Sequence, residues 1–299
     1  MTNFSEIYKT CKDSEYDILD AYKAKKSHLS HSSLSKFRSS PFEFLMYKSI
    51  DRPKTKALSD GSMMHMLLLE PEKFSKGYYV VDDDVICKTI AGEHWESKGK
   101  RPRSTAKYKE WIAAYENKYQ GMERVDIVQL KNLQASIDRA LDSNLTFKDL
   151  IRKLRQDGKA ENAMIKDIKG YPVKAILDID HPDFIADLKF VSNNSLQSTY
   201  RDYWGEKYWT WVQQGLYASL YDFKKKHFLL YMNHQGDVAV RSVPVAALQR
   251  GHQEFLYWLE KFDYCINDLG RLNLDSSFWQ NQNSHDLILP QWISDSPNE

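Results

Sequence analysis

Apolar and polar residues alternate most regularly between Tyr171 and Val191, in the segment YPVKAILDIDHPDFIADLKFV. Alternation with a period of two is typical of a β-strand that turns one face to the core. The segment therefore predicts two antiparallel strands over residues 172–180 and 184–191, and the stretch before it predicts a third strand over residues 160–168. We expect these three strands to form the centre of the fold.

The register of the two later strands decides which side chains share a face. Pairing Ile179 with Phe184 sets an apolar residue opposite an apolar residue along the whole hairpin, so we expect this register. It places Asp178 and Asp187 on one face as diagonal neighbours, about 7 Å apart, with Lys189 on the same face. Two carboxylates and a lysine suit metal-assisted phosphodiester hydrolysis, because the acids can hold a hard divalent cation and the ammonium can orient water or phosphate.

The Asp-x-Lys triplet alone is a weak indication in a chain with 28% charged residues, and an ordinary solvated strand face is the alternative. A second polar residue strengthens the functional interpretation. Residues 57–74, ALSDGSMMHMLLLEPEKF, predict a helix that ends near Pro71, and His65 lies inside its apolar stretch. Gly61, one turn earlier, leaves space for a metal or phosphate beside His65, whereas a core histidine satisfied by its neighbours is the alternative.

Helical spacing or strand alternation covers most of the remaining chain. An amphipathic helix is expected at residues 1–26, and two short helices follow, the second starting at Ser40-Pro41. Further helices are expected at residues 105–119, 126–142, 145–155, 202–221 and 246–268, strands at 75–85, 226–232 and 237–243, and a polar loop at 193–200.

Length and composition predict one large folded domain over residues 1–299. Of the 299 residues, 42% are hydrophobic, which is enough for a sizeable core. We divide the domain into an N-terminal helical extension (1–56), a core (57–268) and a C-terminal docking tail (269–299). No stretch approaches the ~20 apolar residues that span a bilayer, and no signal-peptide core is seen, so we expect a soluble cytoplasmic protein without membrane contact. The three cysteines have no spacing typical of a disulfide framework or a zinc site.

The formal net charge of +1 says little about binding partners, but the distribution of the charged residues along the chain is informative. The most basic stretch runs from Ser97 to Lys109, SKGKRPRSTAKYK, and predicts either contacts with a phosphate backbone or a solvated loop. Gln213 and Tyr217, one turn apart on the predicted helix 202–221, could reach a nucleic acid or support a metal site. The basic residues that we single out are Lys98, Lys100, Arg101 and Arg103.

The order of these features resembles the PD-(D/E)XK nuclease superfamily. The matching motifs are Gly-x-x-x-His ending at His65, Asp178 nine residues before the Asp-x-Lys of Asp187, and Gln-x-x-x-Tyr beginning at Gln213. The segments SSLSKFRSSPFEF, ALSDGSMMHMLLLEPEKF, IADLKF, QQGLY and LPQWI are similar to the exonuclease VIII (RecE-type) nuclease domain of phages and prophages. The resemblance implies an α/β (α+β) restriction-endonuclease-like core, with a central mixed sheet flanked by helices and extra N-terminal helices.

The resemblance also implies roles for individual residues. His65, Asp178, Asp187 and the backbone carbonyl of Leu188 would hold the divalent metal, and Lys189 would position the water nucleophile. Three further residues match the family pattern: Gln213 and Tyr217 would support the site and contact DNA, and Glu161 matches an acidic position whose role stays open.

The implied function is a Mg²⁺-dependent exonuclease, with Mn²⁺ as a substitute, that acts on double-stranded DNA ends. It would degrade the 5′-ended strand to leave 3′ overhangs for phage-type recombination, together with a single-strand annealing recombinase. A ring-shaped homo-oligomer, such as a tetramer, in the cytoplasm of a bacterial or phage-infected cell is implied as well. The alternatives are a structure-specific or single-strand nuclease of the same superfamily, and a catalytically inactive DNA-binding protein on this fold.

Overall fold

The computed structural model describes residues 28–40, 43, 44, 47, 56–96, 98–205 and 209–267. The chain divides into two compact units, Arg52–Leu256 and a smaller one that combines Met1–Asp51 with Tyr257–Glu299. The predicted helix at residues 1–26 and the predicted docking tail at 269–299 lie outside the described residues. The division of the chain at residues 57 and 268 stays a prediction.

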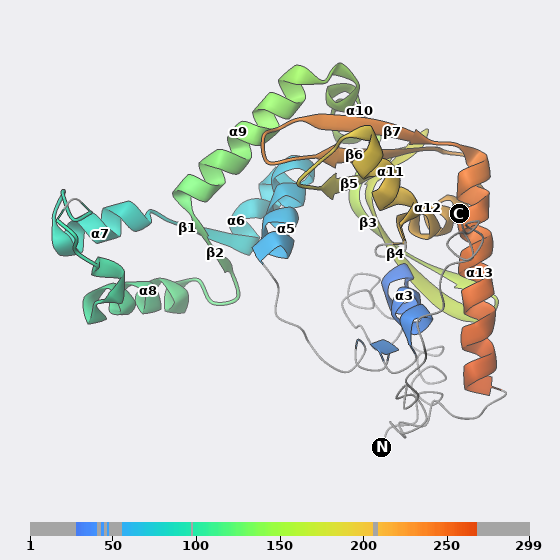
Figure 1. The fold of residues 1–299 in the computed structure, drawn as a ribbon, viewed down its shortest axis with the longest axis horizontal. Coiled ribbons are helices and arrows are strands. Elements are labelled where there is room, and N and C mark those ends of the chain that lie inside the picture. Colours follow the sequence, from blue (N-terminus) through green and yellow to red (C-terminus); the bar gives the residue numbers. More distant parts are fainter. Residues whose placement is uncertain are drawn as a thin grey trace, which may run out of the picture. The chain divides into compact units, whose positions relative to one another are not determined.

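The larger unit is built on a five-stranded mixed sheet (Figure 1). The strands lie in sequence order, and only the pair β5–β6 is parallel. This confirms the predicted α/β core with a central mixed sheet. The strands are β3 (Lys159–Ile168), β4 (Tyr171–Asp180), β5 (Phe184–Phe190), β6 (Lys226–Met232) and β7 (Val238–Val243).

Helices cover both faces of this sheet, and β6 shows why. Its residues Leu230 and Met232 join one apolar core, whereas Leu229 and Tyr231 join another on the opposite face. A strand that is apolar on both faces must be covered on both. The first core includes α5 (Lys56–Leu69), α9 (Ile127–Ser143) and α10 (Leu145–Asp157), and the second includes α11 (Leu196–Trp204), α12 (Thr210–Ser219) and the part of α13 (Val245–Asn267) up to Leu256.

Two glycines let α12 and α13 pack with their backbones in contact. A Cβ added at Gly215 would lie 2.3 Å from the backbone nitrogen of His252, and one at Gly251 would lie 2.1 Å from the carbonyl oxygen of Trp211. Any larger residue at either position would push the helices apart. This close packing fixes α12, which carries Gln213 and Tyr217, against α13.

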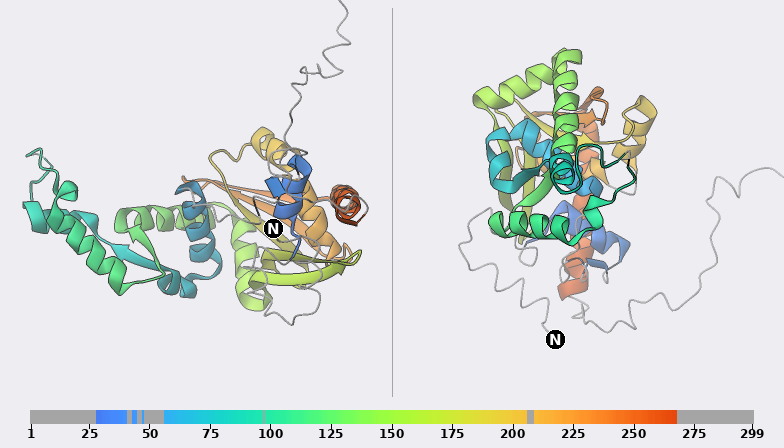
Figure 2. Two further views of the ribbon diagram at one scale, coloured as in Figure 1. Left: turned by 90° about the horizontal axis from the view of Figure 1, so that it is seen from below. Right: turned by 90° about the vertical axis from the view of Figure 1, so that its left-hand side faces the viewer.

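Between α5 and α9 the chain forms a small parallel pair of strands and two further helices. After α5 come the short helices η1 (Pro71–Lys73) and α6 (Phe74–Gly77), and η2 (Pro102–Ser104) precedes α8. Helices α7 and α8 lie side by side (Figure 2). The pair consists of β1 (Tyr78–Val81) and β2 (Glu123–Asp126), and the helices are α7 (Asp83–Ala91) and α8 (Ala106–Lys118).

The described part of the smaller unit contains α3 (His31–Ser39). Ser30 caps this helix, because its hydroxyl accepts the N–H of Ser33. Phe37 and Phe44 pack edge-to-face with each other and with Phe262 of α13, at centroid distances of 6.1, 5.3 and 5.2 Å. Such edge-to-face pairs stabilise a small aromatic core.

Several predicted elements are wrong in detail. The strand expected at 75–85 ends at Val81, because Asp82 accepts the N–H of Val85 and caps α7 instead. The polar loop expected at 193–200 is mostly α11. The single helix expected at 202–221 is interrupted, since Trp209 has a φ of 55° and α12 starts only after it. Within the described residues, no helix is long and apolar enough to cross a bilayer.

Candidate active site

The candidate site lies where β4 and β5 separate. Their pairing comprises Asp180 with Ile185 and Ile179 with Ala186, next to a tight turn closed by the N–H of His181 and the carbonyl of Phe184. The predicted pairing of Ile179 with Phe184 is therefore wrong by two residues. Two residues beyond Ala186, the N–H of Leu188 donates to the carboxylate of Asp178 at 2.7 Å instead of to a backbone carbonyl. The carboxylate thus enters the opening between the strands.

His65 of α5 reaches the same opening. Its Nε2 lies 2.9 Å from the carbonyl oxygen of Leu188 and 3.9 Å from Oδ2 of Asp178, and its Nδ1 lies 3.2 Å from Oε1 of Glu161. His65, Glu161 and Asp178 each have one potential ligand atom that lies within 4.8 Å of the other two. The fold therefore brings together a helix, two strands and a backbone carbonyl that are far apart in the sequence.

Glu161 reaches His65 through an unusual backbone conformation. Its φ is 47°, although it is the third residue of β3 and has paired residues on both sides. The pairs on either side, Ala160 with Ile179 and Asn162 with Leu177, keep one register, so no residue is inserted and only Glu161 itself leaves the regular ladder. Positive φ costs a non-glycine residue about 1–2 kcal/mol. Strain of this kind clusters at functional sites.

Asp187 and Lys189 lie on β5 and form a second cluster. The Nζ of Lys189 is 2.9 Å from Oδ2 of Asp187, whose side chain is only 3% exposed. The same Nζ donates to Oε1 of Gln213 at 3.0 Å, and Nε2 of Gln213 donates to the hydroxyl of Tyr217 at 2.9 Å. The lysine is therefore held by two elements: Gln213 of α12, which Tyr217 orients, and Asp187 of its own strand.

Burial and mutual charge shift the titration of these groups. Burial raises the pKa of Asp178 to about 7, with the charge of His65 acting against it. Burial lowers the pKa of His65, but the carboxylates of Asp178 and Glu161 outweigh this and raise it to about 9. Burial also lowers the pKa of Lys189, but the charges of Asp187 and Asp178 raise it above its ordinary value. Lys189 is therefore a permanent cation at neutral pH.

The donor atoms at the opening fit a divalent cation. They are an imidazole nitrogen, carboxylate oxygens and a backbone carbonyl, all pointing to one place. Oxygen-rich sets with one imidazole suit Mg²⁺ or Mn²⁺, and no thiolate contributes within the described residues. Protonated His65 currently donates to the Leu188 carbonyl and Glu161, so a cation would displace the Nε2 proton.

The basic stretch before α8 is separate from this cluster, and part of it has structural partners. Arg103 Nε donates to Asp83 at 2.5 Å, and its guanidinium lies 5.1 Å from the centre of the Trp95 ring. The Nζ of Lys100 donates to the carbonyl of Ala91 at 2.8 Å. Lys98 and Arg101 are exposed. Contact of these four residues with DNA stays a prediction.

The sequence did not point to two residues near Lys189. The hydroxyl of Tyr231 donates to Oδ2 of Asp202 at 2.9 Å. Burial raises the pKa of Asp202, and the charge of Lys189 acts in the opposite direction, which places this carboxylate within electrostatic reach of the lysine. Asp202 lies on α11, in a segment whose alternation and charge resemble any surface helix, so no sequence signal marks it.

Comparison with known proteins bears on the family and the fold. Residues 30–227 match the family described as PDDEXK-like domain of unknown function (DUF3799). No curated protein matches the sequence. A crystal structure from Eubacterium rectale, provisionally named an exonuclease, is similar in fold, with a TM-score of 0.54 and 13% identity, covering 95% of this chain and 99% of that chain. The crystal structure of SSO0001 has a TM-score of 0.25 and 14% identity, covering 66% and 85% respectively.

Proposed function

Because the chain belongs to the family of PDDEXK-like domains, we propose that it is a metal-dependent nuclease that degrades double-stranded DNA from its ends. One observation carries the proposal: His65 Nε2, the Asp178 carboxylate and the Leu188 carbonyl converge where β4 and β5 separate. Lys189, paired with Asp187, follows directly on the same strand. Each of these groups has a task in phosphodiester hydrolysis.

His65, Asp178 and the Leu188 carbonyl would hold Mg²⁺ or Mn²⁺, with Asp187 as a further acid beside them. Bound there, the cation would supply positive charge for the phosphate and lower the pKa of water in its shell. Glu161 accepts from Nδ1 of His65, which keeps that nitrogen protonated and leaves Nε2 as the ligand atom. The strained backbone of Glu161 gives it the direction that this contact needs.

Lys189 would orient the attacking water or a phosphate oxygen. Its ammonium stays protonated, and its position is fixed from two sides, by Asp187 and by Gln213. The hydroxyl of Tyr217 accepts a hydrogen bond from Nε2 of Gln213. This contact holds the Gln213 amide in the orientation in which Oε1 faces the lysine. Fixed donors act more strongly on developing charge than mobile ones, because no reorganisation is needed during the reaction.

The finer parts of the proposal come from the resemblance of the flanking segments to exonuclease VIII. They are resection of the 5′-ended strand, use of Mg²⁺, partnership with a single-strand annealing recombinase, a ring-shaped homo-oligomer, and action in the cytoplasm of a bacterial or phage-infected cell. Each of them depends on the nuclease activity itself, which is the first property to test.

The test is digestion of linear and covalently closed circular DNA of the same sequence, with Mg²⁺, with chelator, and with the variant Asp187→Asn. We expect loss of the linear form alone, only with metal and only in the wild type. Cutting of the closed circle would replace the exonuclease by an endonuclease. No cutting of either form by the wild type would refute nuclease activity and favour a DNA-binding protein.

A further inference from the structure

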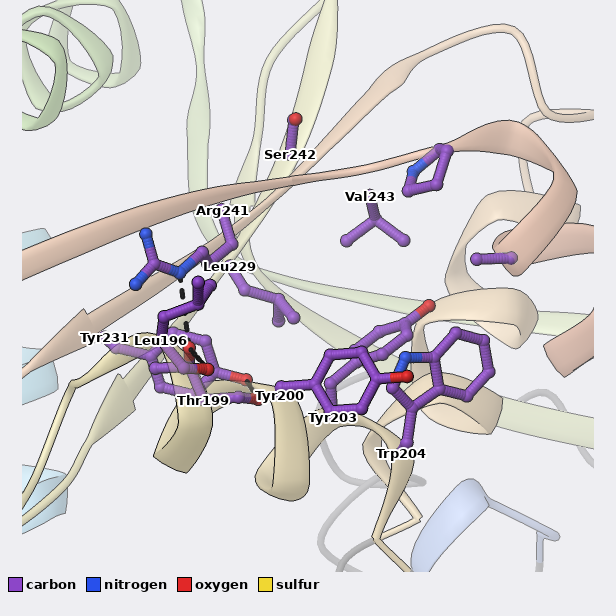
Figure 3. Close-up of a pocket in the computed structure, with 12 residues that line it drawn as sticks. Leu196, Thr199, Tyr200, Tyr203, Trp204, Leu229, Tyr231, Arg241, Ser242 and Val243 are labelled. Carbon is purple, nitrogen blue, oxygen red and sulfur yellow. Dashed lines mark hydrogen bonds between the residues drawn. The ribbon is translucent and has the colours of Figure 1, made fainter.

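A pocket of about 220 Å³ lies between α11, the last two strands of the sheet and the start of α13. Figure 3 shows Tyr200, Tyr203 and Trp204 along α11 on one side and residues 241–243 of β7 on the other. Leu229 and Tyr231 of β6 also line the pocket. None of these pocket residues is used by the proposed hydrolysis.

The pocket lies on the same sheet face as Asp187 and Lys189. In the parallel pair β5–β6, Asp187 is the register partner of Leu229, and Lys189 is the partner of Tyr231. Neighbouring strands are about 4.8 Å apart, so the pocket begins one strand away from the lysine. Tyr231 connects the pocket with the lysine, because the Tyr231 hydroxyl donates to Asp202 and the charge of Asp202 acts on Lys189.

The walls present aromatic surface to the solvent. Tyr200 is 63% exposed and Trp204 is 39% exposed, and together with Leu196 they repeat every fourth residue along α11. Trp204 packs edge-on against Tyr203 at 4.9 Å and lies 5.7 Å from the ring of Trp211, so its own orientation is fixed. A rigid aromatic face that is left open is suited to stacking with a flat ligand.

The polar groups of the pocket favour a ligand that carries negative charge and hydrogen-bonding edges. Arg241 is held by its Nε, which donates to Thr199 Oγ1 at 3.2 Å, and no acid among the described residues forms an ion pair with it. The hydroxyl of Tyr203 is buried in the pocket wall without a hydrogen-bond partner in the described part of the chain. An unsatisfied buried hydroxyl is costly, and a polar ligand atom could satisfy it.

We propose that this pocket holds an unpaired nucleobase of the DNA strand next to the hydrolysed bond. The inference rests on the proposed nuclease function and names the form of DNA that the site receives. The base would stack on Tyr200 and Trp204, while Arg241 would contact the adjoining phosphate. A purely apolar partner surface would leave Arg241 and the Tyr203 hydroxyl without a role, which is why a nucleic acid is favoured over a protein.

The test compares two single-stranded probes of equal length, an oligothymidylate and an oligonucleotide that lacks all its bases, in the presence of chelator so that no hydrolysis occurs. Fluorescence anisotropy gives the affinity of the full chain for each probe. The wild type should bind the base-containing probe more tightly. Tyr200→Ala and Trp204→Ala should each reduce that preference by about fivefold to a hundredfold, the range for one lost stacked base.

Tyr264→Ala is the matched control, because Tyr264 is 51% exposed on α13 and outside the pocket. It should leave both affinities unchanged. An unchanged base preference in Tyr200→Ala and Trp204→Ala would overturn the proposal, and so would a change of oligomeric state, measured by sedimentation, without a change in DNA affinity. Digestion of linear DNA by the wild type reports on the nuclease function separately, so the two failures can be told apart.

Discussion

The substitution Glu161→Gln tests whether Glu161 controls His65. It keeps the length of the side chain but removes its charge, at a contact of 3.2 Å between Oε1 and Nδ1. The side chains of His65 and Glu161 are 25% and 32% exposed, so solvent weakens their interaction only in part. A hydrogen bond between charged groups contributes about 1.5–3 kcal/mol, and partial exposure selects the lower value.

A loss of about 1.5 kcal/mol corresponds to about one pKa unit. We therefore expect the pKa of His65, raised to about 9 in the wild type, to fall by about one unit in Glu161→Gln. Loss of a carboxylate behind a metal-binding histidine reduces metal affinity by about 10- to 100-fold in other proteins. The same reduction is expected here for the Mn²⁺ affinity after correction for proton competition at His65, because a neutral amide holds the Nδ1 proton more weakly than a carboxylate does.

The pKa is measured by NMR titration of the imidazole nitrogens in the metal-free protein, with His65→Gln to identify the signal. Calorimetry gives the affinity for Mn²⁺. Glu110→Gln serves as the control, since Glu110 is an exposed glutamate of α8. If Glu161→Gln leaves both the pKa of His65 and the Mn²⁺ affinity at the wild-type values, the positioning role of Glu161 is refuted.

The remaining predictions concern the ion pair, pH and the basic stretch. Asp187→Asn or Lys189→Met should each cost about 3 kcal/mol of unfolding free energy in urea, because each leaves a charge in the site without its partner; the double variant should lose less than the sum, and additive losses would contradict the pairing. Since the pKa of His65 is raised to about 9, the histidine is protonated below that pH, and Mn²⁺ affinity should fall by up to about tenfold per pH unit below 9. A calorimetric affinity that stays constant from pH 6 to 9 would contradict this. Arg101→Glu should weaken DNA binding and its salt dependence without lowering Tm, whereas Arg103→Glu should lower Tm as well, because Arg103 pairs with a buried acid; equal Tm values for the two variants would count against the structural role of Arg103.

The central hairpin shows what alternation can and cannot predict. It correctly predicts β4 and β5, and Ile179, Ala186 and Leu188 on them face one core. The register is wrong by two residues, and a shift of two preserves the faces, so apolar residues still meet apolar residues in either register. The turn decides between the two: the N–H of His181 bonds to the carbonyl of Phe184, which leaves a two-residue loop in place of the longer one that the sequence indicated.

The sequence marks the residues of the candidate site but not the contacts between them. The spacing of Asp178, Asp187 and Lys189, together with the family resemblance, pointed to one locus, and His65 came from its place in an apolar helix. The direction of Glu161 depends on a single positive φ that no glycine marks in the sequence. The sequence predicts a loop over residues 193–200, although α11 begins at Leu196, because the regularly spaced apolar residues of this helix face an open pocket instead of the core.

The most direct measurement for the central claim is calorimetric titration of Mn²⁺ into the metal-free wild type and into Asp178→Asn. Asp178 is the acid that enters the opening between β4 and β5, where it bonds to the Leu188 N–H and lies 3.9 Å from His65. The amide keeps the shape but loses the charge that a cation needs. We predict saturable binding by the wild type and its loss in the variant. Equal binding by both proteins would show that the cation is held elsewhere and would contradict the account of this site.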